Sequence, residues 1–188
     1  MSLNNIEEIA NYIVSDGKGI LAADESNPTC GKRFDSIGVE STEENRRDYR
    51  EMLFRSKGIK GNIGGVILFD ETIRQSSDDG TLLRDIISNQ GALPGIKVDK
   101  GLQPIDGCPG ETVTVGLEGL NERLNEYSSM GAKFTKWRAV INIGDGIPTD
   151  KCIDANMEAL ADYAKCAQDN GMVPIVEPEV LMDGDHSI

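Results

Sequence analysis

The residues of this chain best suited to chemistry are charged side chains near the ends of apolar, strand-like segments. They are Asp24, the pair Lys97 and Asp99, the pair Lys136 and Arg138, and the pair Glu177 and Glu179. Because successive side chains on a strand point to opposite faces, the members of each pair share a face. Charged groups on buried strands are unfavourable unless they pair with one another or serve a reaction. The set is therefore a candidate site.

The types of these side chains fit a carbonyl substrate that carries phosphate. A lysine held near another cation has a lowered pKa, which makes its neutral amine available to attack a carbonyl. Nearby carboxylates can move the protons that imine formation and carbon–carbon cleavage require. Arginine and lysine also bind phosphate groups. The set predicts iminium chemistry on a phosphorylated sugar.

Neither a metal nor a cofactor is predicted. The chain contains one histidine, His186, so a zinc site built from several histidines is excluded. The loop after the first predicted strand has neither the GxGxxG pattern of dinucleotide-binding proteins nor the GxxxxGKS/T pattern of nucleotide-binding loops.

Each charged group also has a purely structural interpretation. Asp24 can cap a turn, Lys97 can form an ion pair with Asp99, and either glutamate of the last pair can be solvated. Lys136 and Arg138 are harder to explain in this way, because they flank Trp137 in an apolar segment without nearby acids. The recurrence of such groups on successive strands favours the functional interpretation.

Short strand patterns alternate with helical patterns along the chain. The predicted strands are residues 19–24, 65–70, 95–99, 134–141 and 173–177. The predicted helices run from a capping box of Ser41 and Glu44 to about Arg55, and over residues 81–89, 117–130 and 150–170. In the last helix, three- and four-residue spacing predicts one apolar face made of Ile153, Met157, Leu160, Ala164 and Ala167.

This alternation predicts an α/β protein with a parallel sheet, either an open doubly wound sheet or a TIM (β/α)₈ barrel. In a barrel the charged strand ends converge on one mouth, whereas an open sheet spreads them along a crevice. The barrel explains the charge pattern with fewer assumptions. No linker divides residues 1–188, so we expect a single domain holding about the first five βα units of a barrel.

The composition limits the classes of partner. A net charge of −13 argues against nucleic acid and anionic membranes. No apolar run reaches the roughly 20 residues of a membrane span, and the acidic N-terminus resembles neither a signal nor a transit peptide. The four cysteines lack CxxC spacing, which is typical of a reduced cytoplasmic protein.

Six segments, taken in order, resemble the class I fructose-bisphosphate aldolase family. They are residues 17–26 (GKGILAADES), 42–47 (TEENRR), 64–69 (GGVILF), 95–101 (GIKVDKG), 136–138 (KWR) and 173–179 (VPIVEPE). The triplet is unspecific alone, but the ordered set is very specific. The resemblance implies reversible cleavage of fructose 1,6-bisphosphate to dihydroxyacetone phosphate and glyceraldehyde 3-phosphate in glycolysis and gluconeogenesis.

The resemblance also implies catalytic roles for four residues. Asp24 resembles the aspartate that supports the Schiff-base nitrogen and takes part in carbon–carbon cleavage. Lys136 resembles the lysine that assists imine formation. Glu177 is similar to the general acid/base of carbinolamine dehydration, and Glu179 to its neighbour in the hydrogen-bond network.

Four further residues resemble substrate-binding positions of the family. Lys97 and Arg138 correspond to residues that contact the glyceraldehyde-phosphate half of the substrate. Arg33 corresponds to a substrate-binding arginine after the first strand, and Arg46 to another in the TEENRR segment.

Other expectations follow from the family. Its nucleophilic lysine lies on a sixth strand, beyond this sequence, and its members are commonly tetramers, so a homotetramer is expected for the complete protein. The NPTC segment at residues 27–30 resembles plastid or bacterial members, which leaves a plastid compatible with the sequence. Two alternatives stay open: an inactive fragment or interaction module that needs a C-terminal half and self-associates through an open sheet edge, and another phosphosugar lyase.

Overall fold

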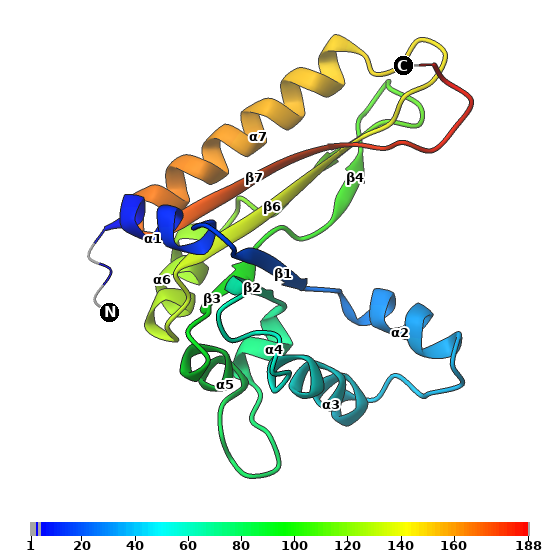
Figure 1. Ribbon diagram of the computed structural model, residues 1–188. Coiled ribbons are helices and arrows are strands. Elements are labelled where there is room, and N and C mark those ends of the chain that lie inside the picture. The colour runs from blue at the N-terminus through cyan, green and yellow to red at the C-terminus, as the bar shows by residue number, and fades with distance from the viewer. Residues whose placement is uncertain (1–2, 4, 188) are drawn as a thin grey trace.

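A five-stranded parallel sheet forms the centre of the computed structural model, which describes residues 3 and 5–187 (Figure 1). The strands are β1 (Gly19–Ala23), β2 (Ile63–Leu68), β3 (Leu93–Lys97), β6 (Phe134–Ile141) and β7 (Val173–Val180). All five predicted strands are present, although β2 and β3 each begin and end two residues early and β7 continues to Val180. Their spatial order β1-β2-β3-β6-β7 follows the chain without the reversal of a doubly wound sheet. This order agrees with the start of a barrel.

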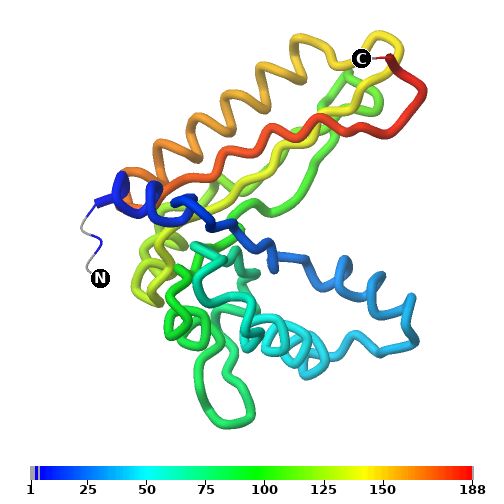
Figure 2. Tube along the Cα trace, in the orientation of Figure 1, coloured from blue at the N-terminus to red at the C-terminus, as the bar shows by residue number. Residues whose placement is uncertain are grey.

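Helices connect the strands. They are α1 (Ile6–Ile13), α2 (Asn27–Asp35), α3 (Glu43–Phe54), α4 (Asp70–Arg74), α5 (Leu83–Asn89), α6 (Leu120–Ser129) and α7 (Asp150–Asp169). A small antiparallel hairpin of β4 (Leu102–Pro104) and β5 (Thr112–Thr114) follows β3. The long helix α7 runs along β6 and β7 (Figure 1). After β1 the chain leaves the sheet through α2 and returns through α3 (Figure 2).

Two details of the predicted helices are wrong. Thr42, not Ser41, caps α3, because the Thr42 hydroxyl accepts a hydrogen bond from the Asn45 backbone nitrogen at 3.1 Å. In α7, Ile153 and Met157 are 37% and 38% exposed. The buried face of α7 instead consists of Cys152, Asn156, Ala159, Leu160, Tyr163 and Ala167.

Polar contacts explain this shift of the buried face. The Asn156 side chain donates to the Thr112 carbonyl at 2.9 Å, which binds α7 to the hairpin. The Tyr163 ring stacks on Trp137 with 5.4 Å between ring centroids. Its hydroxyl lies 2.7 Å from the Thr135 hydroxyl. An apolar periodicity cannot detect buried positions that are held by amide and hydroxyl groups.

The two faces of the sheet carry different side chains. On the face covered by helices, Trp137 and Ala139 of β6 belong to the main apolar core. On the opposite, inner face, Phe134 packs with Ile13 and Ile67. Side-chain alternation therefore puts Phe134, Lys136 and Arg138 on one inner row, which changes from apolar to charged toward the carboxyl end of β6.

Glycines make room for the apolar floor of this inner face, the cluster of Ile13, Ile67 and Phe134. A Cβ atom on Gly65 would lie 2.8 Å from the Phe134 ring, and one on Gly95 would lie closer still. A Cβ atom on Gly64 would overlap the backbone of Ile13, so α1 packs directly against β2. The Phe134 ring and α1 thus fill the inner face at its amino end, and the charged groups stand above this floor.

Candidate active site

A cavity of about 960 Å³ lies at the carboxyl ends of the strands. Six of the eight predicted site residues line it: Asp24, Lys97, Lys136, Arg138, Glu177 and Glu179. They come from four strands or from the loop directly after a strand. The other two, Arg33 and Arg46, are not among its lining residues.

Lys136 is the centre of the charged cluster. Its Nζ atom lies 3.3 Å from Asp24 Oδ2 and 3.2 Å from Glu177 Oε2. The Lys136 side chain is 12% exposed, whereas that of Glu177 is 33% exposed. Three chain segments thus bring one ammonium group and two carboxylates into hydrogen-bond distance beside a cavity.

The electrostatics of Lys136 correct one prediction. Burial disfavours the ammonium form, but the carboxylates of Asp24 and Glu177 outweigh burial and raise the pKa of Lys136 above its ordinary value. The expected lowering of a lysine pKa by a neighbouring cation is therefore wrong for Lys136. No acid lies next to Lys136 in the sequence, and its two carboxylate partners, Asp24 and Glu177, come from the β1 and β7 regions far away along the chain.

Two more ion pairs stand beside this cluster. Lys97 pairs with Asp99, and Arg138 pairs with Glu179. The Lys97–Asp99 pair confirms the structural interpretation of that spacing, yet both residues also line the cavity. Asp99 Oδ2 is buried and has no hydrogen-bond partner among the described residues. A ligand in the cavity could supply that missing partner.

The remaining two predicted residues serve contacts outside the cavity. The Arg33 side chain is 57% exposed and pairs with Glu25. Arg46 is only 10% exposed and binds Glu71 through two nitrogen atoms, at 2.8 and 2.6 Å. The hydrogen bonds with Glu71 raise the pKa of Arg46, and those from Arg46 lower the pKa of Glu71. Arg46 thereby joins α3 to α4.

A polar wall that the sequence analysis did not single out completes the cavity. Asp70 accepts hydrogen bonds from Tyr127 at 2.8 Å and from Arg74 at 2.9 Å. Arg74 also donates to Glu126 at 2.6 Å. Burial raises the pKa of Asp70, but the hydrogen bonds from Arg74 and Tyr127 outweigh burial and lower it overall. Asp70 ends the predicted strand 65–70, so the signal that selected Asp24 also marks Asp70.

The part of the chain that the structure describes contains neither a metal-binding cluster nor a helix suited to a membrane. Within residues 3 and 5–187, no group of three or more His, Cys, Asp or Glu side chains is arranged to hold a metal ion. None of the helices in the described part of the chain has both the length and the apolar character that a membrane crossing requires.

Comparison with known proteins decides the family. Residues 5–188 match the family model of fructose-bisphosphate aldolase class-I. The chain belongs to the class I fructose-bisphosphate aldolase family. This confirms the resemblance of the six ordered segments.

Individual relatives agree with this assignment. The aldolase chain is 56% identical to a probable fructose-bisphosphate aldolase class 1 of Xanthomonas campestris, over 100% of its own length and 56% of that protein. It is 52% identical to the cytosolic fructose-bisphosphate aldolase 4 of Arabidopsis thaliana, over 99% of its length and 48% of that protein. The chain therefore spans about half the length of these curated relatives.

A solved structure confirms the fold. The aldolase of Plasmodium falciparum, determined in complex with TRAP and a small-molecule inhibitor, superposes with a TM-score of 0.94 at 46% identity. The match covers 100% of this aldolase chain and 58% of the Plasmodium chain. The predicted partial TIM barrel is correct.

Proposed function

We propose that the whole protein is a lyase that cleaves fructose 1,6-bisphosphate reversibly to dihydroxyacetone phosphate and glyceraldehyde 3-phosphate, as part of glycolysis and gluconeogenesis. The observation that carries this proposal is the cluster of Asp24, Lys136 and Glu177, which meet beside a cavity of about 960 Å³. The family and the names of its relatives support the choice of substrate. No cofactor enters the proposed reaction.

In the first half of the proposed reaction, a neutral lysine amine attacks the C2 carbonyl of the sugar, and the carbinolamine loses water to form an iminium. We assign this amine to a residue other than Lys136, because the carboxylates of Asp24 and Glu177 lie 3.3 and 3.2 Å from Lys136 Nζ and favour its ammonium form. The resemblance assigns the nucleophile to a lysine beyond residue 188. Glu177 protonates the leaving hydroxyl and becomes a carboxylate, and its exposure of 33% gives it access to water, from which it regains a proton.

In the second half, Asp24 accepts the proton of the C4 hydroxyl while the C3–C4 bond breaks. The electron pair of that bond moves into the iminium and gives an enamine, and the aldehyde product leaves. Lys136 stabilises both carboxylates electrostatically in these steps. Glu179 holds Arg138 through their ion pair.

Substrate binding is assigned first to the cations that line the cavity. We propose that Lys97 and Arg138 contact the glyceraldehyde-phosphate half of the substrate. Arg33 is exposed and can reach a ligand only by leaving Glu25. Arg46 would have to give up two hydrogen bonds to Glu71, so its direct contact with substrate has the least support of the four.

Chemical trapping tests this proposal. Borohydride treatment of the whole protein with dihydroxyacetone phosphate should leave a reduced adduct on one lysine, which peptide mass mapping can locate. An active protein without adduct would contradict iminium chemistry. An adduct on Lys136 would contradict the electrostatic role given to it here.

The assembly and compartment are further parts of the proposal. We propose a homotetramer in the cytoplasm, with a plastid as the alternative that residues 27–30 leave open. Light scattering of the purified whole protein would test the tetramer, and fractionation of the source cells would test the compartment.

A second proposal concerns the 188-residue chain taken by itself. In the described part of the chain, β1 and β7 are the end strands of the sheet and each pairs with one strand. Such edges favour association with other edges. We propose that this chain alone self-associates and does not turn over the sugar bisphosphate. Measurable cleavage by the purified 188-residue chain would contradict this.

A further inference from the structure

We propose that Arg50 is a positioning residue of the site, whose guanidinium fixes the backbone on both sides of Asp24. The inference rests on the proposed function in so far as Asp24 takes part in the reaction. Arg50 lies on α3 and is not among the residues that line the cavity.

The contacts of Arg50 enclose one residue. Its Nε atom donates to the Ala23 carbonyl at 3.0 Å, and its Nη2 atom donates to the Glu25 carbonyl at 2.7 Å. These carbonyls belong to the residues immediately before and after Asp24. A single rigid, planar group therefore holds the peptide that joins Ala23 to Asp24 and the peptide that follows Glu25, one on each side of Asp24.

The position of Asp24 in the sheet explains why such a clamp is needed. The pairing of β1 with β2 ends at the register Ala23↔Leu68, so Asp24 lies just beyond the last paired residue. Beyond Ala23 the backbone is no longer paired with β2, so hydrogen-bond donors from other elements must hold this segment in place. Arg50 supplies two of them.

Arg50 is itself held firmly. Its side chain is 1% exposed, and a buried guanidinium is tolerated only when it is paired and hydrogen-bonded. The Glu25 carboxylate provides that pairing at 3.2 Å. Glu25 also accepts a hydrogen bond from Tyr49 at 3.3 Å, and Arg33 binds the same carboxylate. The clamp therefore joins β1, α2 and α3.

The consequence concerns the distance between Asp24 and Lys136. Asp24 Oδ2 lies 3.3 Å from Lys136 Nζ, near the upper limit of a hydrogen bond. A backbone shift of about 1 Å would remove this contact, and displacements of that size can reduce turnover roughly 100-fold. Arg50 thus acts on the reaction through Asp24.

The first test compares Arg50→Lys with Arg47→Lys in the whole protein. Lysine keeps the charge at position 50 but cannot bridge two carbonyls with a planar fork. We expect kcat to fall roughly 10- to 100-fold with KM nearly unchanged, because Lys97 and Arg138, the binding cations that line the cavity, do not contact Arg50. Arg47 lies on the same helix and pairs with Asp48 and Asp78 near the surface, so its replacement should leave kcat unchanged. If Arg50→Lys does not fold, Arg50→Gln replaces it.

The second test asks whether Arg50 acts through Asp24. In an Asp24→Asn background, the further loss caused by Arg50→Lys should shrink to less than about twofold, since coupled residues are not additive. An undiminished loss in that background would overturn the proposal, because a merely structural role would act equally in both backgrounds.

The third test does not depend on activity. Amide hydrogen exchange of the segment 19–26 should be faster in Arg50→Lys, and unchanged in Arg47→Lys. Unchanged exchange in Arg50→Lys overturns the clamp even in an active enzyme. Full activity of Asp24→Asn with faster exchange in Arg50→Lys would instead overturn the proposed role of Asp24 and leave the clamp in place.

Discussion

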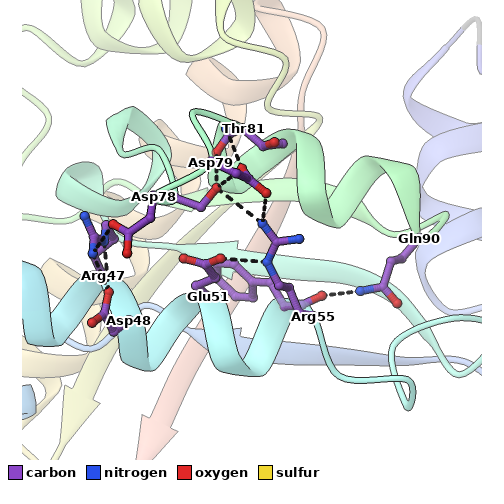
Figure 3. A network of polar contacts seen from close by, with 10 residues as sticks. Arg47, Asp48, Glu51, Arg55, Asp78, Asp79, Thr81 and Gln90 are labelled. Atoms are coloured by element: carbon purple, nitrogen blue, oxygen red, sulfur yellow. Dashed lines mark hydrogen bonds and ion pairs between the residues drawn. The ribbon is translucent and has the colours of Figure 1, made fainter.

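Two networks of basic and acidic side chains occur in this molecule, one beside the cavity and one on the outer surface. The cavity cluster joins Lys136 to Asp24 and Glu177. In the outer network, Arg55 lies between Glu51 of α3 and Asp79 of the loop between α4 and α5, and Arg47 lies between Asp48 and Asp78 (Figure 3). Both networks pair a basic side chain with two acidic ones, so the pairing of charges does not distinguish them.

Burial and support distinguish the two networks. The Lys136 and Asp24 side chains are 12% and 10% exposed, and they stand on the apolar floor around Phe134. The Arg55 and Asp79 side chains are 45% and 57% exposed. Water and salt screen exposed pairs, whereas a partly buried cluster keeps its field and its geometry. The buried Lys136–Asp24 pair is therefore less screened by solvent than the Arg55–Asp79 pair.

The largest expected effect comes from removing the central cation of the cavity cluster. Lys136→Met leaves Asp24 and Glu177 close together without their shared counter-ion, so kcat/KM of the whole protein should fall roughly 10²- to 10⁴-fold. Steady-state cleavage of fructose 1,6-bisphosphate measures it. Arg55→Met is the matched control, because it removes the central cation of the outer network. Equal activity of Lys136→Met and Arg55→Met would contradict the catalytic role given to the cavity cluster.

The second-largest effect is expected from disturbing the apolar floor around Phe134 that lies below the cavity cluster. The outer network has no such support. Gly95→Ala would place a methyl group against the Phe134 ring, and such overpacking costs about 1–3 kcal/mol of unfolding free energy. Urea unfolding measures the loss. Gly19→Ala is the control, since a Cβ atom there meets nothing within 4 Å. Adding Phe134→Leu to Gly95→Ala should restore part of the stability. If Gly95→Ala and Gly19→Ala unfold alike, the floor is not tightly packed.

The sequence could predict the five strands of the sheet and the side chains of the cavity cluster, because strand alternation places Lys136 and Arg138 on one face. It could not predict the partners of Lys136, since Asp24 is 112 residues away and only the sheet brings them together. The helix α2 was missed because NPTCGKRFD contains a proline and a glycine and has little apolar periodicity.

The spacing of the buried residues in α3 is a sequence signal for the face that this helix buries. Arg46, Arg50 and Phe54 recur at four-residue spacing and are all buried, whereas the Arg47 side chain is 19% exposed. Steps of four residues back from the apolar Phe54 thus identify Arg50 and Arg46 as residues on the buried face of α3. This spacing cannot reveal that Arg46 binds Glu71 and that Arg50 binds the carbonyls around Asp24, because those partners lie in other elements.

A smaller effect should appear in the pH dependence of stability. The pKa of Lys136 is raised in the folded state, so its contribution is fully present below the unfolded pKa of about 10.4 and is lost as pH rises through the folded pKa. The difference in unfolding free energy between the unmodified protein and Lys136→Met should therefore be larger at pH 8 than at pH 11.5. Urea unfolding at both values measures it. A difference that widens with pH would mean that the folded pKa is lowered.

The smallest effect is expected in the outer network itself. Arg55→Met removes the contacts with Glu51 and Asp79, but solvent already weakens both. The urea midpoint should fall less than in Gly95→Ala, and the fall should shrink further between 10 mM and 1 M sodium chloride because salt screens exposed charges. The same salt series on Lys136→Met should change its loss of stability much less. Equal salt sensitivity of the two variants would show that the cavity cluster is as well solvated as the surface, and the physical basis for assigning it the chemistry would disappear.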